Sequence, residues 1–222
     1  MVVEIIQREV PTRGIGYIIL RDCPEERLGE ALGRGMEKLK KAGAKSVLAT
    51  SLPEGEPLHP GPCGVWRLTH VHDMVAMEAP LTGREKPQDK LVLRPLKRSS
   101  EDRVFLELAG RSFDGVPNAR TYTAAGLHRQ GIRAGLAYQG EALVGLYEVD
   151  LTEKIPALAA LAIAPDLRRQ GLGRRLLRTL LDGMRSPTCT LTVSSANLPA
   201  LELFRSEGFA QTGVVSNWFE VV

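Results

Sequence analysis

The stretch "APDLRRQGLGRRLL", residues 164–177, places arginines around two glycines where an apolar run ends and a leucine-rich segment begins. Three interpretations compete: a nucleic-acid patch, the solvated start of a helix, or a cradle for a phosphate group. The first N–H groups of a helix lack partners within the helix, and the helix dipole adds positive charge there. Gly171 and Gly173 carry no Cβ, so the backbone can approach a ligand closely. We therefore expect an anion site that suits a diphosphate, with further positive charge from Arg168, Arg169 and Arg174.

The solvated-helix interpretation accounts for Arg175 and Arg178. It does not account for paired glycines at a helix start, where glycine costs about 1 kcal/mol relative to alanine. The stretch is not the dinucleotide-binding fingerprint, because Leu176 stands at the third glycine position. It is not a P-loop either, because no Gly-Lys-Ser/Thr is present.

The composition is that of an ordinary globular protein of one large or two small domains, with 222 residues, 43% hydrophobic and 25% charged. A net charge of +3 and only 5% aromatic residues disfavour a nucleic-acid partner. We expect no membrane span and no signal peptide, so the cytoplasm is the expected location. The three cysteines lie far apart without CxxC spacing and imply no disulfide framework.

Strand and helix patterns alternate along the second part of the chain and predict a mixed α/β sheet. The polar stretch 83–90 is interpreted as a linker between an N-terminal domain (1–82) and a C-terminal domain (91–222). Strands are expected over 91–96, over 132–150 as a pair with a tight turn at Gln139-Gly140, over 156–165 buried on both faces, over 189–195, and over 209–222 as a closing pair. Helices are expected over 99–113, 118–131, 172–184 and, capped by Asn197, 198–208.

Two motifs in this part resemble the GNAT superfamily of CoA-dependent N-acetyltransferases. Arg168, Gly171 and Gly173 satisfy that family's Gln/Arg-x-x-Gly-x-Gly/Ala motif, with Pro165 ahead of it. A second block follows in "NLPALELFRSEGF", where members commonly read Leu-Tyr-x-x-x-Gly-Phe. The resemblance covers roughly residues 91–222. It implies a mostly antiparallel sheet with splayed central strands, flanked by helices.

The resemblance also implies an acetyl-CoA site. The backbone amides of Arg169, Gln170, Gly171, Leu172, Gly173 and Arg174 would hold the pyrophosphate. The edge of strand 157–164, at Leu161, Ala162 and Ile163, would pair with the pantetheine arm where it splays from strand 189–195. Asn197 would contact the cofactor, or act as a plain helix cap, or both. We expect acetyl-CoA as co-substrate and no metal.

The catalytic groups depart from the family pattern. Phe204 stands where members often have a tyrosine that protonates the departing thiolate; its absence should cost at most about 2 kcal/mol, because a thiol pKa lies near 8.5. Strand 157–164 has no carboxylate, so Glu148 is the candidate base, against the alternative that it is a solvent-facing strand residue. The stretch "SFDGVPNARTY" is a candidate lid, with Asp114 and Tyr122 as acceptor contacts.

The pKa of the attacking amine limits which class of acceptor is expected. Neutralising a lysine at pH 7 costs about 4.6 kcal/mol, whereas an α-amine costs only about 1 kcal/mol. With no strong base, a small-molecule amine or an α-amine is therefore the expected acceptor. A non-catalytic acyl-CoA-binding or sensing protein is the main alternative, and a nucleic-acid binder is a third. The oligomeric state stays open, a homodimer included.

The N-terminal part repeats the strand–helix–strand order, and setting Leu28-Gly29 against Leu172-Gly173 aligns the two copies at a shift of 144 residues. We interpret residues 1–82 as a degenerate half-copy with the order β-α-β-β. Its turn carries Asp22, Glu25 and Glu26 in place of arginines, so we expect no CoA binding there. The residues His59, Cys63, His70 and His72 lack standard zinc spacing; we expect His70 and His72 on one face of a polar hairpin instead.

Overall fold

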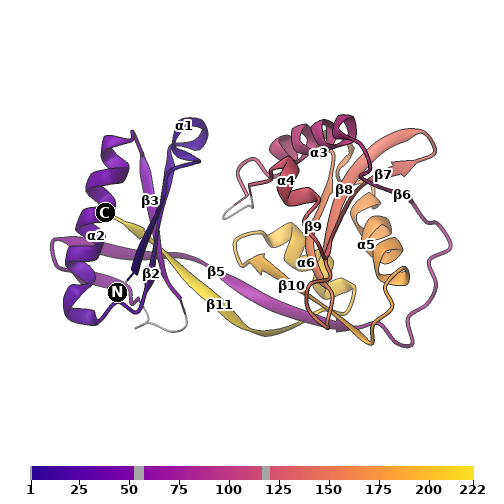
Figure 1. Ribbon diagram of the computed structural model, residues 1–222. Helices are drawn as coiled ribbons and strands as arrows, with labels where there is room; N and C mark the ends of the chain where they lie inside the picture. The colour runs from indigo at the N-terminus through magenta and orange to yellow at the C-terminus, as the bar shows by residue number, and fades with distance from the viewer. Residues whose placement is uncertain (1, 53–57, 117–120) are drawn as a thin grey trace. The chain divides into compact units, whose positions relative to one another are not determined.

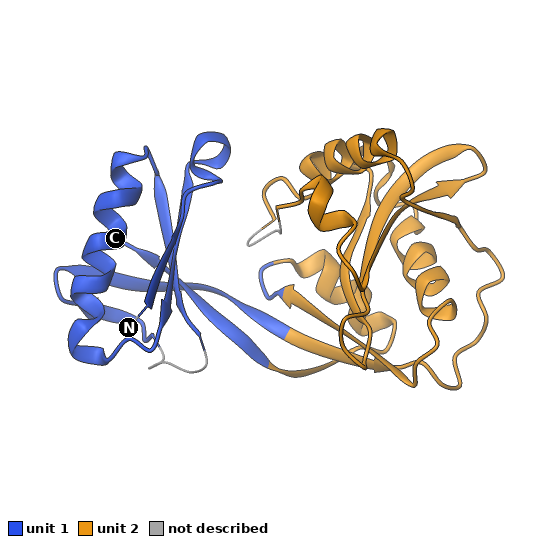
Figure 2. Cartoon of the chain, in the orientation of Figure 1, with its two compact units in different colours: residues 1–75, 194–196, 214–222 blue, residues 76–193, 197–213 orange. Residues whose placement is uncertain are grey.

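The computed structural model describes residues 2–52, 58–116 and 121–222 (Figure 1). The chain divides into two compact units, coloured separately in Figure 2. Unit 1 comprises residues 1–75, 194–196 and 214–222, and unit 2 comprises residues 76–193 and 197–213. Residues 83–90, expected as a linker, thus lie inside unit 2. Among the described residues, no helix is long and apolar enough to cross a membrane.

Unit 1 holds β1 (Val2–Ile6), α1 (Val10–Arg13), β2 (Ile15–Arg21), α2 (Glu25–Lys41), β3 (Ser46–Ser51) and β4 (Gly61–Cys63). Unit 2 holds β6 (Val92–Pro95), α3 (Ser99–Ser112), α4 (Ala124–Leu127), β7 (Ile132–Gln139), β8 (Ala142–Asp150), β9 (Ala157–Ile163), the 3₁₀ turn η1 (Pro165–Leu167), α5 (Leu172–Asp182) and α6 (Leu198–Ser206). Three strands contribute residues to both units: β5 (Trp66–Pro80), β10 (Thr188–Ser194) and β11 (Ala210–Val221).

In unit 1, the long helix α2 packs on one sheet. The strand order is β1-β2-β3-β11-β5, with β4 paired to β5, and β2 and β3 are parallel. The predicted strand–helix–strand order of β2, α2 and β3 is confirmed. Leu32 and Leu39 of α2 are fully buried in the core. Gly35 lies so close to Ile18 that a Cβ would clash, which explains a glycine inside this helix.

Unit 2 has the strand order β5-β10-β9-β8-β7-β6; the pairs β6/β7, β7/β8 and β8/β9 are antiparallel, and β9 is parallel to β10. Helices α3 and α4 cover one face, where Phe105 and Leu127 pack on Leu146 and Ala160. Because alternate residues of a strand face opposite sides, Ile163 of β9 faces the other way, toward Gly173 of α5. The predicted fold class, a mixed and mostly antiparallel α/β sheet flanked by helices, is confirmed.

Three predicted elements are wrong. The helix expected over 118–131 is the single turn Ala124–Leu127; Thr123 caps its start, and residues 117–120 lie outside the described residues. The strand pair expected over 209–222 is the one strand β11, because Gly213 does not turn the chain. Strand β9 is not buried on both faces, since Ala159 is exposed.

The histidines of β5 do not share one environment. The His72 side chain is buried at 1% exposure and stacks on Trp218, with ring centres 6.2 Å apart. His70 is exposed and contacts Phe219 edge-on, while its Nε2 lies 2.6 Å from Asp73. Because Trp218 and Phe219 are successive residues of a strand, the two rings lie toward opposite faces, and the expectation of one shared face is wrong.

Candidate active site

The glycine turn ends β9 and begins α5. Gly171 is the N-cap of α5 in the left-handed conformation, with φ +77°, and no side chain caps the helix. The first hydrogen bond of the helix runs from the Arg175 N–H to the Gly171 carbonyl. The N–H groups of the first turn therefore have no partner within the helix. A Cβ at Gly171 would meet no described atom within 4 Å, so the turn is open on that side.

Arg169 is the second left-handed residue of this turn, with φ +64°. A non-glycine residue in this region costs on the order of 1–3 kcal/mol and marks a conformation that the surrounding structure enforces. Its side chain is exposed, and the structure gives it no ion pair within the described ranges. Within the described ranges, the Arg169 side chain thus has no acidic partner.

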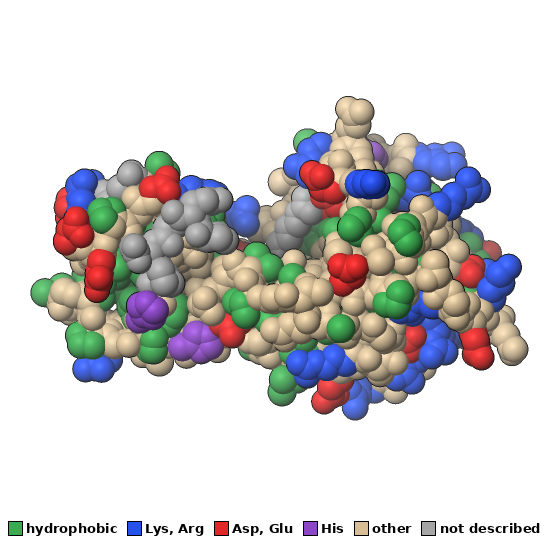
Figure 3. All heavy atoms as spheres, turned by 90° about the horizontal axis from the view of Figure 1, so that it is seen from below, with side chains coloured by type: hydrophobic (Ala, Val, Ile, Leu, Met, Phe, Trp, Pro, Cys, Tyr) green, Lys and Arg blue, Asp and Glu red, His purple; other side chains and the backbone are tan. Residues whose placement is uncertain are grey.

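The other arginines are held by acidic or carbonyl oxygens. Glu207, a buried residue, lies 3.0 Å from Arg174 Nε and accepts a hydrogen bond from Arg178 Nε at 2.8 Å. Arg175 pairs with Asp89 at 2.6 Å. The Arg178–Glu207 hydrogen bond raises the pKa of the Arg178 guanidinium. Figure 3 likewise shows basic side chains beside acidic ones on the face that it displays. The arginine cluster is an ion-pair network more than a basic patch.

The edge of β9 lies open beside the turn. Pairing with β10 is confined to Ala157 and Leu158, after which the two parallel strands separate. The Ala164 N–H donates to Val144 of β8, so by alternation the Ala162 peptide groups also face β8. The N–H and C=O groups of Leu161 and Ile163 then point to the edge that β10 has left, where the Ile163 carbonyl accepts a hydrogen bond from Arg168 Nε at 3.3 Å. Of the three β9 residues expected to meet the cofactor, these two have the required direction, and Ala162 does not.

The second motif follows β10. The Asn197 side chain accepts a hydrogen bond from the Ala200 N–H at 3.4 Å, which confirms the predicted helix cap of α6. Phe204 is buried and packs edge-on against Phe209, with ring centres 5.7 Å apart. A phenyl ring has no proton to donate, so the family's usual acid is missing at this position.

The acceptor-side candidates lie on the face that α3 and α4 cover. Glu148 of β8 is 1% exposed and stands opposite Ala134 and Ala160, so the expectation of a solvent-facing side chain is wrong. Tyr122 stacks on Phe113, with ring centres 6.0 Å apart and planes inclined by 27°. Asp114 is exposed just beyond α3.

Two hydrogen bonds on this face are not predicted by any local pattern in the sequence. His128 Nε2 lies 2.9 Å from the carboxylate of Asp102, which is buried, and the pair joins α4 to α3. The Arg168 guanidinium donates to the Ser112 carbonyl at the end of α3, at 2.7 Å. Residues that are 26 and 56 positions apart form these pairs, so a local pattern does not reveal them.

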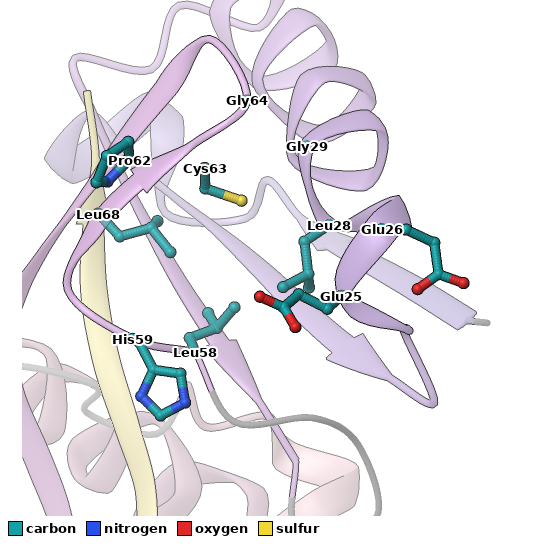
Figure 4. Close-up of a pocket in the computed structure, with 10 residues that line it drawn as sticks. All are labelled: Glu25, Glu26, Leu28, Gly29, Leu58, His59, Pro62, Cys63, Gly64 and Leu68. Atoms are coloured by element: carbon teal, nitrogen blue, oxygen red, sulfur yellow. The ribbon is translucent and has the colours of Figure 1, made fainter.

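A separate cavity of about 440 Å³ lies in unit 1, at the start of α2 (Figure 4). Glu25, Cys63 and His59 line it together with apolar side chains, including Leu28 and Leu68. Burial raises the pKa of the Cys63 thiol, and the Glu25 carboxylate adds to this effect. His59 and Cys63 share this cavity while His70 and His72 do not, and no group of three potential metal ligands occurs among residues 2–52, 58–116 and 121–222.

The turn thus offers helix-start N–H groups to an anion, and the strand edge beside it offers peptide groups that β10 leaves unpaired to an extended chain. Residues 105–209 match the model of the Acetyltransferase (GNAT) family and form a GNAT acetyltransferase domain. The chain is 34% identical over 89 residues to the N-alpha-acetyltransferase RimI of Mycobacterium tuberculosis, covering 38% of this chain and 56% of that protein. It is 37% identical over 62 residues to the [Ribosomal protein bS18]-alanine N-acetyltransferase of Escherichia coli K12, covering 27% and 42%.

Two comparisons cover more of the chain. An uncharacterized protein of Mycobacterium leprae is 28% identical over 188 residues, covering 76% of this chain and 50% of that protein. The chain thus spans about half the length of the curated relatives that it matches. A GCN5-related N-acetyltransferase from Sphaerobacter thermophilus superposes with a TM-score of 0.59 at 13% identity, covering 98% of this chain and 75% of that chain. At this identity the likeness concerns the fold.

Proposed function

We propose that the chain transfers the acetyl group of acetyl-CoA to a primary amine, either of a small molecule or an α-amine. The observation that carries the proposal is the junction of the open β9 edge with the uncapped start of α5 at Gly171. The family match over residues 105–209 supports it.

The proposed cofactor site uses backbone more than side chains. The amides from Arg169 to Arg174 hold the pyrophosphate, because helix-start N–H groups favour anions. The exposed Arg169 side chain adds the remaining positive charge. The peptide groups of Leu161 and the N–H of Ile163 bind the pantetheine arm as an added strand would, and Asn197 borders the site while capping α6.

The proposed reaction is direct. The neutral amine attacks the thioester carbonyl carbon, a C–N bond forms, the C–S bond breaks, and CoA leaves as a thiolate. Glu148 receives the proton that the amine loses, from its place on the acceptor-side face of β8. Since Phe204 donates no proton, the thiolate leaves unprotonated or takes its proton from water, at a cost of at most about 2 kcal/mol.

An α-amine is the favoured acceptor. The free energy needed to form the neutral amine at pH 7 is about 3.6 kcal/mol lower for an α-amine than for a lysine side chain. The relatives from Mycobacterium tuberculosis and Escherichia coli are named an N-alpha-acetyltransferase and an alanine N-acetyltransferase, which supports the same class. Tyr122 and Asp114 are the proposed contacts to this acceptor.

Residues 1–82 are proposed to be a degenerate half-copy that does not bind CoA. Their β2–α2–β3 arrangement has the same parallel strand pairing as β9–α5–β10. However, β2 and β3 stay paired from Ile15 to Leu20, so no strand edge opens between them. Carboxylates of Glu25 and Glu26 lie at the start of α2, where they repel a diphosphate.

A second candidate is an acyl-CoA-binding or sensing protein without turnover. The buried phenyl ring of Phe204 at the acid position favours it. This candidate shares the cofactor site, so binding does not separate the two functions, whereas turnover does.

The test is acetyl transfer from acetyl-CoA to matched peptides, followed by mass spectrometry. One peptide has a free α-amine and no lysine; the other has a blocked N-terminus and one lysine. We expect acetylation of the first at pH 7 and little of the second, with the gap narrowing as the pH rises. Preference for lysine at pH 7 would contradict the acceptor class. Tight acetyl-CoA binding without any product, across these peptides and small amines, would favour the second candidate.

A further inference from the structure

Arg168 occupies the first position of the glycine motif, and its exposed side chain binds two backbone carbonyls of neighbouring segments. Its guanidinium donates from one terminal nitrogen to the Ser112 carbonyl at 2.7 Å, and from Nε to the Ile163 carbonyl at 3.3 Å. One side chain therefore joins three segments: the cofactor turn, the end of β9 and the end of α3.

The hydrogen bond from Arg168 to Ser112 caps the C-terminal end of α3. Ser112 is the last residue of α3, so its carbonyl has no N–H partner within the helix. A guanidinium there makes a charge-assisted hydrogen bond and also offsets the negative end of the helix dipole. Ser112 is only 3% exposed, so water replaces this donor poorly when the arginine is removed.

The acceptor-side residues begin directly after this point. Phe113 follows Ser112 and stacks on Tyr122, which in turn meets Phe105 edge-on, with ring centres 5.4 Å apart. Moving the end of α3 would move the Phe113 ring and with it the proposed acceptor contact. The path from the cofactor turn to Tyr122 thus consists of one hydrogen bond and one ring stack.

We propose that Arg168 is a positioning residue that couples occupation of the cofactor turn to the order of the acceptor side. This inference rests on the proposed function. Binding of the cofactor fixes the turn on which Arg168 stands, and Arg168 then fixes Ser112 and Phe113. By linkage, the amine and the cofactor each strengthen the binding of the other. The guanidinium acts on the acceptor side and leaves the phosphates to the backbone amides and Arg169.

The test compares Arg168→Met with Arg111→Met. Arg111 pairs with Asp166 at 3.3 Å and so joins the same helix to the same turn, but both side chains are about two-thirds exposed, at 66% and 70%. Such a pair contributes little, and this variant is the matched control. Three quantities are measured for each: the Kd of CoA by calorimetry, the hydrogen exchange of residues 106–116 with and without CoA, and the KM of the amine at saturating acetyl-CoA.

For Arg168→Met we expect a CoA Kd within about threefold of the native value, loss of the CoA-dependent protection at 106–116, and an amine KM raised about tenfold. Arg111→Met should match the native chain in all three. A CoA Kd weakened more than about tenfold with an unchanged amine KM would overturn the proposal, since the guanidinium would then serve the cofactor directly. Protection that persists in Arg168→Met would overturn it as well.

Arg168→Gln, which keeps one donor, is the variant to use if Arg168→Met does not fold; it should show the same changes in smaller degree. The exchange measurement needs only CoA, so it judges the coupling separately from catalysis. If the native chain transfers no acetyl group but Arg168→Met loses the CoA-dependent protection, the proposed function fails and the coupling stands. If the native chain transfers acetyl groups and Arg168→Met keeps the CoA-dependent protection, the proposed function stands and the coupling fails.

Discussion

Replacing Gly171 by alanine separates the cost to the fold from the cost to cofactor binding. The residue has φ +77°, and a Cβ there meets no described atom within 4 Å, so the free protein has room for the methyl group. The expected destabilisation is that of a left-handed alanine, about 1–2 kcal/mol. For a chain of this size that lowers the Tm by about 2–4 °C per kcal/mol.

The same methyl group stands where the proposed diphosphate approaches the backbone. We therefore expect the Kd of acetyl-CoA, measured by calorimetric titration, to rise at least tenfold, about 1.4 kcal/mol. Gly140 in the β7–β8 turn is the matched control, because it has φ +60° and equally open surroundings. Gly140→Ala should lower the Tm by a similar amount and leave the Kd unchanged.

Two results would refute this reasoning. If Gly171→Ala bound acetyl-CoA as well as the native chain, the cofactor would not approach the backbone at this turn. If Gly140→Ala weakened binding equally, the effect would come from general destabilisation and not from the site.

Three further results are expected. Glu148→Gln should lower kcat about 100-fold with an unchanged acetyl-CoA Kd, while Asp150→Asn on the same strand should not; a kcat within about threefold of native would exclude Glu148 as the base. Burial lowers the pKa of His72 below that of the unfolded chain, so the folded state resists protonation; the Tm should be level above about pH 6.5 and fall below it, and His72→Phe should flatten that slope. An equal slope in both proteins would contradict this assignment. Burial raises the pKa of the Cys189 thiol to about 11, so iodoacetamide at pH 8 should modify Cys63 well before Cys189, as peptide mass mapping would show; equal rates would count against the buried thiol.

Local patterns in the sequence predicted the elements that depend on neighbours along the chain. The β7–β8 hairpin, the helix α5 and the Asn197 cap each follow from residues within a few positions of one another. The glycine turn was also predictable from the sequence. The N-cap of α5 is left-handed and has no side-chain cap, which is a position that favours glycine, and Gly171 stands there.

What the sequence did not predict depends on contacts between distant segments. Arg168, Arg169 and Arg174 were expected to add positive charge at the turn, but Glu207 neutralises Arg174 from another element. Glu207 and Asp89 likewise pair with Arg178 and Arg175, which were expected to be solvated. Arg168 was expected to face the cofactor and instead caps α3. Such partners are set by tertiary packing, which periodicity does not encode.

The central claim is that acetyl-CoA lies along the β9 edge with its pyrophosphate on the start of α5. Backbone amide NMR shifts, recorded during titration with acetyl-CoA, test it most directly. We expect the largest changes at Gln170–Arg174 and at Leu161 and Ile163, with little change at Glu25–Leu28 of unit 1. Changes centred on unit 1, or none at the glycine turn, would contradict it.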